Sequence, residues 1–511
     1  LANFPAMSFT RRSALVVVTS LFALVPARAL RAQSTTPVVS QPLPAQTIAA
    51  GAGVSTIDLR NYFALPNVPG QIAQIDTVRG KFNVELLAAE AARWFKGNLH
   101  THSLWSDGDD YPEMIADWYK RNGYQFLGIS DHNVLQEGGK WFELKQPVSL
   151  KGEVVQRGGG AVLEKYLARF GPDWVEQRMT GAKREVRLKP LAEYRSLLED
   201  AGKFLMIPAE EVTGAWKVAR TETSPERGGP VHINAINLRD LLPGHTGASA
   251  VEVMRRTLDE LHAQRERTGQ PMFAHLNHPN FRSGVTAEDI LQVERQRFFE
   301  VYNGHPGVVN DGDALHLSMD AMWDVVLTFR LADLKLGLVW GIGTDDSHHY
   351  HRIALGQSNT GRGWVMVRAR HLTAESIVRA MDDGDFYASS GVTLADVRRA
   401  PGRLSVEIQP EPGVTYVTRF IGTRRGFDRA SAELLPPAPP KGGVRTVPHR
   451  RYSADVGAVL AEVSGPRAEY VFKGDELYVR AKVISSKPKA NGSVAGEFET
   501  AWVQPVTGST P

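Results

Sequence analysis

The histidines of this chain are concentrated in one region and stand where short apolar runs end. Thirteen of the fifteen lie between His100 and His351, most of them close to carboxylates. In parallel α/β folds, the residues that follow the strands meet at one edge of the sheet. Histidine and carboxylate are the ligands that borderline divalent metals prefer. The pattern therefore predicts an α/β fold that gathers a multinuclear metal site at its strand ends.

Apolar runs alternate with helical periodicity from residue 94 to about residue 391, which we interpret as the α/β domain. Residues 137–200 interrupt this rhythm with a glycine turn and charged amphipathic helices. Such an insertion is either a lid over the site or a plain surface excursion, and both remain open. The predicted strands are Phe126–Ile129, Phe204–Ile207, Pro271–Ala274, Phe298–Val301 and Leu338–Gly341, and the predicted helices include Tyr111–Arg121 and Val251–Arg267.

The two ends of the chain have a different composition. Residues 392–511 contain alternating strands such as Leu477–Val483, which predicts a C-terminal all-β, sandwich-like domain. Residues 34–93 begin with a stretch rich in Pro, Ser, Thr and Gln and continue with short alternating runs. We interpret residues 34–93 as a linker followed by a short β-rich segment.

Residues 1–33 have the features of a secretory signal peptide. Arg11 and Arg12 precede an apolar stretch from Ala14 to Val25, and an A-x-A exit ends at Ala29. We expect an exported protein, periplasmic or extracellular, without stable membrane association after cleavage. The arginine pair leaves the twin-arginine route open, and an uncleaved membrane anchor is the alternative.

The remaining composition excludes several classes of protein. Arg11, Arg12 and Arg28 account for the whole formal charge of +3, so the mature chain is close to neutral and no nucleic-acid partner is expected. The chain has no cysteine, which excludes disulfides and thiolate zinc sites. It contains neither a phosphate-binding P-loop motif nor the G-x-S-x-G motif of serine hydrolases.

The densest motif is Leu99-His100-Thr101-His102. Residues i and i+2 of a strand share a face, so both imidazoles can reach one ion. Asp107 follows a few residues later, and the pair Asp131-His132 closes the next predicted strand. This combination is a much stronger sign of a metal site than an isolated H-x-H motif.

From these motifs the chain resembles the PHP (polymerase and histidinol phosphatase) superfamily over residues 94–391. Within it, the residues around Trp94–Gly97 and Phe299–His305 and the C-terminal β extension resemble the carbaryl-hydrolase-like (CehA/McbA) branch. The resemblance rests on six motifs in order: Asn98–Gly108, Ser130–His132, Pro208–Val212, Val231–Asn234, Asn277–Asn280 and Asp346-x-His348.

The resemblance implies a distorted β/α barrel with two or three divalent ions, of Zn, Mn, Fe or Co. It assigns Glu211, rather than Glu210, as the bridging carboxylate, and catalytic roles to Glu211, Asp346 and His305. Two ions ~3.5–4 Å apart would supply a bridging hydroxide at neutral pH. The implied metal ligands are His100, His102, Asp107, His132, Glu211, His232, His278, Asp346 and His348.

Other polar residues near these motifs have more than one interpretation. His305 is either a proton donor to the leaving group or a structural residue, and His275 is expected to be a buried histidine rather than a ligand. Glu210 is expected to orient a ligand histidine. Arg362 either meets an anionic substrate or, as we prefer, belongs to a surface loop. His349 and His351 are expected to face solvent.

Three functions fit a small-molecule substrate. The first is a phosphoesterase, which we favour; the second is a carbamate, ester or amide hydrolase; the third is a metal-stabilised binding module without turnover. A phosphate site needs extra cations, whereas a carbonyl site needs an apolar leaving-group pocket. The chain offers candidates for both, with the cations Lys217, Arg220 and Arg362 and the aromatic residues Trp105, Trp141, Trp216 and Tyr302.

Overall fold

The computed structural model describes residues 91–144, 159–219, 226–400, 402–434 and 448–508. Outside these ranges it describes only the backbone of short strands. The chain divides into two units, residues 1–92 and residues 93–511. The predicted signal peptide and Arg220 lie outside the described residues. Along the described chain, no helix combines the length and the apolar character that a membrane span requires.

The first unit contains short antiparallel strands. Strand β4 (Ile72–Asp76) pairs with both β2 (Val54–Asp58) and β5 (Lys81–Glu85). Strand β1 (Val38–Val39) pairs with β3 (Phe63–Ala64). The predicted β character of this segment is thereby observed.

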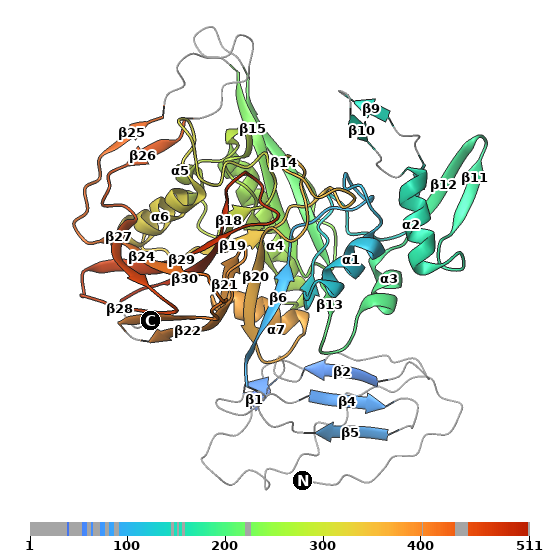
Figure 1. Cartoon of the computed structure of the whole chain (residues 1–511), viewed down its shortest axis with the longest axis horizontal. Helices are drawn as coiled ribbons and strands as arrows, with labels where there is room; N and C mark the ends of the chain where they lie inside the picture. Colours follow the sequence, from blue (N-terminus) through green and yellow to red (C-terminus); the bar gives the residue numbers. More distant parts are fainter. Residues whose placement is uncertain are drawn as a thin grey trace. The chain divides into compact units, whose positions relative to one another are not determined.

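The second unit is built on a mixed sheet of nine strands (Figure 1). Strand β6 pairs in parallel with β7 and antiparallel with β20, so only part of the sheet has the parallel pairing expected of an α/β fold. In spatial order the strands are β13 (Leu205–Met206), β7 (Phe126–Leu127), β6 (Arg93–Asn98), β20 (Trp364–Ala369), β21 (Phe386–Ser389), β30 (Phe498–Val506), β29 (Glu476–Pro488), β24 (Tyr416–Arg424) and β27 (Ala458–Ser464).

A second sheet of six strands lies in the same unit, in the order β16 (Thr246–Gly247), β14 (Ala209–Val218), β15 (Arg227–Ile236), β17 (Phe273–Leu276), β18 (Phe298–Asn303) and β19 (Trp340–Thr344). Two isolated parallel bridges, Thr101 with Ser347 and His132 with Glu211, connect it to the ends of β6 and β7. The ends of β6, β7, β14 and β19 therefore meet. Closure into a β/α barrel stays a prediction.

Helices flank these sheets, and local sequence signals define their ends. Helix α4 begins after Ser249, whose hydroxyl accepts the Glu252 N–H, and ends at Gly269 with φ +67°. Thr286 and Asp289 form a capping box at α5. The helices are α1 (Pro112–Arg121), α4 (Ala250–Thr268), α5 (Ala287–Leu291), α6 (Met319–Phe329) and α7 (Ala374–Asp382), with a 3₁₀ turn at Phe281–Ser283 and a π turn at Arg330–Leu334.

The predicted insertion at residues 137–200 contains a sheet that its charged sequence did not indicate. Strand β12 (Lys183–Leu188) pairs with β11 (Gln177–Thr180) and β8 (Lys140–Glu143). The expected helices are present as α2 (Gly160–Phe170) and α3 (Leu191–Leu198), and β9 (Val148–Leu150) pairs with β10 (Glu153–Val155). The hairpin of β11 and β12 is highly charged because its side chains form ion pairs across the strands, such as Arg178–Glu185.

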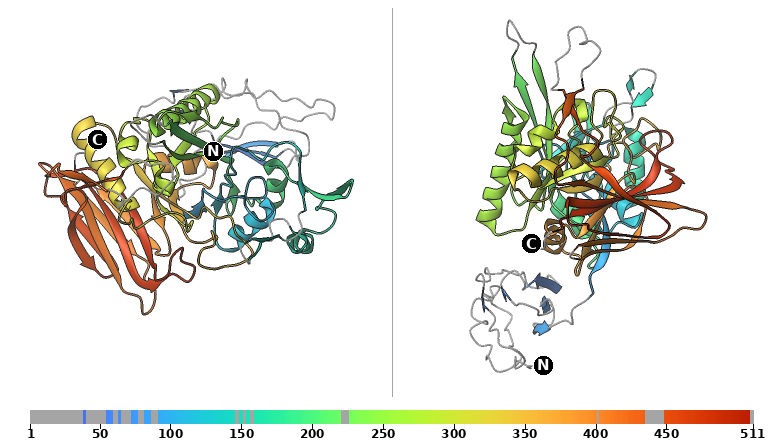
Figure 2. Two further views of the ribbon diagram at one scale, coloured as in Figure 1. Left: turned by 90° about the horizontal axis from the view of Figure 1, so that it is seen from above. Right: turned by 90° about the vertical axis from the view of Figure 1, so that its left-hand side faces the viewer.

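The strands after residue 392 lie together beside α6 (Figure 2). Strands β24 and β29 pack on this helix. Because β29 and β30 belong to the nine-stranded sheet, that sheet runs across the predicted boundary at residue 392, and residues 93–511 form one compact unit. The remaining strands form small sheets, from β22 (Leu394–Ala400), β23 (Arg403–Ile408) and β28 (Arg467–Val471), and from β25 (Ser431–Glu433) and β26 (Arg450–Tyr452).

Candidate metal centre

The nine residues that the resemblance implies as ligands come together at the strand ends. His100 and His102 follow β6, His132 follows β7, and Asp346 and His348 follow β19. Glu211 and His232 lie in the paired strands β14 and β15, and His278 follows β17. Four overlapping groups of ligand atoms within 4.8 Å of one another result.

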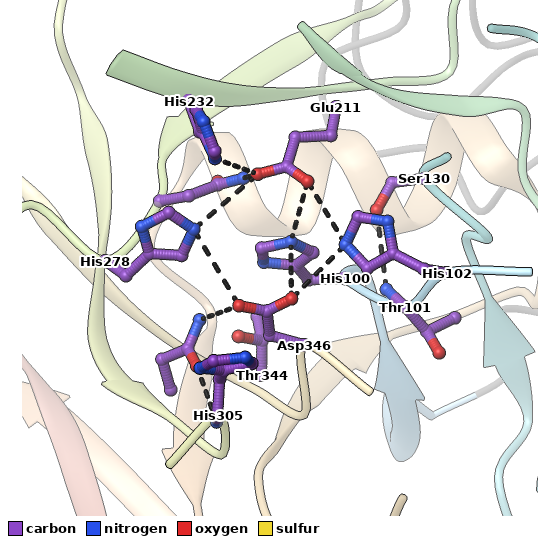
Figure 3. A network of polar contacts seen from close by, with 12 residues as sticks. His100, Thr101, His102, Ser130, Glu211, His232, His278, His305, Thr344 and Asp346 are labelled. Carbon is purple, nitrogen blue, oxygen red and sulfur yellow. Dashed lines mark hydrogen bonds and ion pairs between the residues drawn. The ribbon is translucent and has the colours of Figure 1, made fainter. Parts of the chain in front are cut away.

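Glu211 occupies the middle of these groups (Figure 3). Its Oε2 lies 3.3 Å from His100 Nε2, 3.1 Å from His102 Nε2 and 3.1 Å from His132 Nδ1. Its Oε1 lies 3.0 Å from His232 Nδ1 and 3.6 Å from His278 Nε2. One carboxylate that faces histidines with both oxygens has the geometry expected of a bridging ligand.

Asp346 faces Glu211 across the same space. Its Oδ1 lies 3.3 Å from His100 Nε2 and 3.2 Å from His102 Nε2, and its Oδ2 lies 3.7 Å from His278 Nε2. The backbone of Asp346 and of His278 has positive φ, +47° and +24°. Non-glycine residues adopt this region at a cost, and such strain concentrates at functional sites.

A second group lies toward the solvent and contains His102, Asp107, His132 and His348. Asp107 is exposed and lies 3.5 Å from His132 Nε2 and 3.4 Å from His348 Nε2. These four residues could hold a further ion, beside those that the inner groups could hold.

The buried polar atoms of the centre fit bound cations. Among the described residues, His100 Nε2, His102 Nε2, Glu211 Oε2 and His232 Nδ1 are buried without a hydrogen-bond partner. A buried polar group without a partner is costly, and most such groups in proteins have one. Because these atoms converge, two divalent ions would satisfy them together.

The protonation of the centre is consistent with this. Burial opposes the charged form of His102, but the carboxylates of Asp346 and Glu211, 3.2 and 3.1 Å from its Nε2, outweigh burial and raise the pKa of His102 to about 10. Burial also opposes ionisation of Glu211, yet the charges of His132, His100 and His232 hold its pKa well below the usual range. The carboxylates thus attract positive charge, which protons supply where ions are absent.

Glu300 is a functional residue that the sequence reasoning did not select. It is fully buried, and its Oε1 lies 2.7 Å from His100 Nδ1. Its Oε2 accepts the His278 N–H at 2.8 Å and the Asn303 amide at 2.8 Å. The carboxylate fixes the ring of His100 so that Nε2 faces Glu211 and Asp346, an arrangement common around metal-binding histidines. Glu300 lies within the Phe299–His305 motif of the sequence resemblance, which assigned no role to it.

Asp131 and Asp345 are further buried carboxylates, next to the ligands His132 and Asp346. Asp131 accepts the Ser103 N–H at 2.7 Å and the Ser106 hydroxyl. Asp345 accepts three successive backbone N–H groups, from residues 361, 362 and 363, at 2.6–2.8 Å. Asp131 thus holds the loop between the candidate ligands His102 and Asp107, and Asp345 fixes the backbone next to the candidate ligand Asp346.

His305 lies beside the centre with its ring 5.6 Å from that of His348. Its Nδ1 accepts the Gly307 N–H at 2.9 Å, so the neutral ring carries its proton on Nε2. Burial lowers the pKa of His305 to about 4, which keeps the ring neutral at physiological pH. This tautomer suits a hydrogen-bond donor.

The structure corrects the predictions for Arg362 and Glu210. Arg362 is completely buried, so it is neither a surface-loop residue nor a free cation for a substrate. Glu210 points away from the ligands, since its Oε2 accepts the Leu242 N–H at 2.9 Å. Adjacent residues of a strand face opposite sides, which excludes Glu210 from orienting a ligand histidine.

Three histidines outside the ligand set also have definite places. His275 is buried, as expected, with its ring 6.3 Å from that of His100. His349 and His351 are half-buried rather than facing solvent. His349 Nδ1 accepts the Ser358 N–H, and His351 Nε2 contacts the Asp109 carbonyl oxygen.

The residues proposed to select the substrate lie mostly elsewhere. Lys217 pairs with Glu226 at 3.1 Å on the exposed part of β14 and β15. Trp105, Trp216 and Tyr302 are buried in the core, where Trp216 donates to the Gly284 carbonyl oxygen. Trp141 stacks under Arg178 in the insertion.

Comparisons with known proteins give short or weak similarities. No protein-family model matches the chain. The DNA polymerase/3'-5' exonuclease PolX of Bacillus subtilis (strain 168) is 32% identical over 72 residues, which are 14% of this chain and 12% of that protein. The match thus spans about an eighth of the relative's length.

Among solved structures, a two-domain protein from Bacteroides vulgatus ATCC 8482 is described as containing a predicted PHP-like metal-dependent phosphoesterase. It aligns with a TM-score of 0.33 and 15% identity, covering 81% of this chain and 95% of that chain. Membership of the PHP superfamily, and of its carbaryl-hydrolase-like branch, stays a prediction.

Proposed function

We propose that the chain is a metal-dependent hydrolase of the PHP superfamily, and that its substrate is a phosphoester. The observation that carries the proposal is the convergence of unpartnered His100, His102 and Glu211 atoms in a buried, carboxylate-rich centre. A core without a cation would leave these atoms unsatisfied. The curated relative is named an exonuclease, an enzyme that cleaves phosphodiesters, which supports the same choice.

Each residue of the centre has a role in this proposal. His100, His102 and Asp346 would hold one ion, His232 and His278 a second, and Glu211 would bridge them. Asp107, His132 and His348 would hold a third ion. His102 lies between this site and the first one. When bound, the ions would supply Lewis-acid activation of water and of the bond that is broken. His305 would donate a hydrogen bond from its Nε2–H to the leaving group and keep its proton.

The alternative, a carbamate, ester or amide hydrolase of the carbaryl-hydrolase type, has one observation in its favour. Phe281 lies edge-on to His278 and His305, with ring centroids 5.1 and 5.9 Å apart. An aromatic side chain there would line an apolar leaving-group pocket. The adjacent cation, Arg282, is exposed, lies 5.1 Å from the Phe281 ring and would instead favour a phosphate.

We also propose that the protein is exported, to the periplasm or beyond the cell, by the general or the twin-arginine route. The arginine pair and the apolar stretch of residues 11–29 support this proposal.

The function is tested with protein reconstituted with Mn, Zn or Co. Its turnover of p-nitrophenyl phosphate, bis-p-nitrophenyl phosphate and 1-naphthyl N-methylcarbamate is compared. We expect phosphate turnover that Arg282→Ala reduces more than Phe281→Leu does. Turnover of the carbamate alone, with the opposite order of the variants, would support the carbonyl hydrolase. Bound metal with no turnover would support a binding module.

A further inference from the structure

Three loops that are distant in sequence meet at the buried guanidinium group of Arg362. Residue 304 belongs to the loop after β18, residues 354–359 to the loop after β19, and Asn491 to the hairpin between β29 and β30. The C-terminal part of the chain therefore reaches the loops around the metal centre.

All three nitrogens of the guanidinium donate to groups in these loops. Nη1 donates to the carbonyl oxygen of Gly304 at 2.9 Å and to that of Gln357. Nη2 donates to the Ala354 carbonyl oxygen at 3.1 Å, and Nε donates to the Asn491 carbonyl oxygen at 3.2 Å. A planar group with donors in a fixed fork can join several carbonyls, which a lysine ammonium cannot do in the same geometry.

Two of these loops carry residues of the centre. Gly304 directly precedes His305, and a Cβ at position 304 would lie 2.7 Å from the Arg362 Cβ. The backbone N–H of His348 donates to the Ser358 carbonyl oxygen at 2.9 Å, and the Ser358 hydroxyl donates to the carbonyl oxygen of Asp346. A displacement of Arg362 would thus displace His305 and the loop that carries Asp346 and His348.

The C-terminal hairpin holds Arg362 from behind. Lys489 Nζ donates to the Arg362 carbonyl oxygen at 2.9 Å and to Glu497 Oε1 at 2.9 Å. The side chain of Lys489 is only 3% exposed. Asn491 Nδ2 donates to the Thr360 carbonyl oxygen at 2.8 Å. Buried charges with several hydrogen bonds fix geometry more strongly than exposed pairs do.

We propose that Arg362, held by Lys489 and Asn491 of the C-terminal hairpin, is a positioning residue for His305 and His348. The inference rests on the proposed hydrolytic function and gives the C-terminal strands a part in it. The innermost ligands, His100 and Glu211, have no contact with this cluster and are expected to keep their ions.

The test uses the full chain with Arg362→Lys, Lys489→Met and Asn491→Ala. The matched controls are Lys487→Met, which removes an exposed lysine two residues before Lys489, and Arg398→Lys, which alters an exposed arginine. Metal content, the absorption spectrum of the Co-loaded protein, the melting temperature and the kinetic constants are measured for each. Metal content and the spectrum need no substrate, so they test the inference even if the proposed function fails.

We expect each of the three variants to lose the ion of the exposed group, to change the Co spectrum and to keep the remaining ions. The kcat should fall about 10- to 100-fold, the size typical of losing a group that orients ligands, with KM changed less than about 3-fold. The controls should behave as the unaltered chain does.

If Arg362→Lys does not fold, Lys489→Met and Asn491→Ala decide the outcome. An unchanged metal content, Co spectrum and kcat in those two variants would overturn the inference. A lower melting temperature together with a lower activity, but with an unaltered Co spectrum, would also overturn the inference. Such a result would show that the cluster has a purely structural role.

Discussion

Two buried polar clusters of the second unit differ in how their charges are satisfied. In the metal centre, Glu211 and Asp346 face histidine nitrogens, several of which have no hydrogen-bond partner. Between α6 and β29, Arg480 instead pairs with Asp324 through two hydrogen bonds, of 2.8 and 2.6 Å. Its Nη1 and Asp320 Oδ1 have no hydrogen-bond partner either, but they lie 2.9 Å apart as an ion pair of opposite charges. The Asp324 cluster contains an arginine as its counter-charge. Among the described residues, the metal centre has no arginine or lysine next to Glu211 and Asp346.

The difference separates a site from a structural ion pair. Buried carboxylates next to arginine are neutralised within the chain, so the cluster needs no ligand. Carboxylates that face histidines form a site in which divalent cations can replace the protons of the rings. Burial of charge alone would not have distinguished the two clusters.

The largest expected effect comes from removing both kinds of ligand from the centre. His100→Ala combined with Asp346→Ala should abolish activity and the binding of the inner ions, measured by elemental analysis of the purified protein. The pair His349→Ala and Glu210→Ala is the control, since neither contacts the central carboxylates. Full metal content and activity in the ligand variant would break the comparison.

The second prediction concerns the structural pair. Arg480→Met alone should lower the free energy of unfolding by about 3–5 kcal/mol, because Asp324 is left buried without a counter-charge. Urea unfolding measures this. Arg480→Met with Asp324→Leu should recover most of the loss. Reduced metal affinity in the folded single variant would contradict a purely structural role.

Glu113 provides an intermediate case, a buried carboxyl that contacts neutral donors. It accepts from the Tyr166 hydroxyl at 2.7 Å and from Trp174 Nε1 at 3.1 Å. Burial raises the pKa of Glu113 from 4.5 to about 7. The folded chain therefore holds this proton while the unfolded chain releases it, and stability is lost as the pH rises through this window.

Glu113→Gln should remove that dependence. The free energy of unfolding of the unaltered chain should fall from pH 5 to pH 8 by on the order of 3 kcal/mol more than that of the variant. Urea unfolding at both pH values gives the comparison. A difference between variant and unaltered chain that is constant with pH would show that Glu113 is ionised in the folded state.

The smallest expected effect is on the residue that orients His100. Glu300→Gln should weaken metal binding about 10- to 100-fold, because the amide cannot accept from His100, His278 and Asn303 at once. Isothermal titration calorimetry with Zn or Mn measures the affinity. Glu210→Gln is the matched control and should leave the affinity unchanged. Equal affinities for both variants would remove Glu300 from the centre.

Much of the centre could be predicted because its ligands follow the apolar runs that form strands. All five predicted strand runs overlap observed strands, and the helices at Tyr111–Arg121 and Val251–Arg267 were confirmed as α1 and α4. The spacing of His100, His102 and His132 indicates a metal site, and the resemblance to the PHP superfamily allowed all nine candidate ligands to be named before their positions were known.

The residues that the sequence did not reveal act through contacts between distant segments. Glu300 lies 200 positions from His100, and no local pattern connects them. Arg362 stands between two glycines, which resembles an exposed loop, but its partners belong to loops at Gly304 and Asn491. The continuity of the nine-stranded sheet depends on the pairing of β21 with β30, more than a hundred residues apart.

The central claim is that cations occupy the space between Glu211 and Asp346. Anomalous X-ray diffraction at the metal absorption edge, from crystals of the Mn- or Zn-loaded chain, tests it most directly. We predict one peak among His100, His102, Glu211 and Asp346 and a second among Glu211, His232 and His278. Metal-loaded crystals without a peak at these residues would contradict the account.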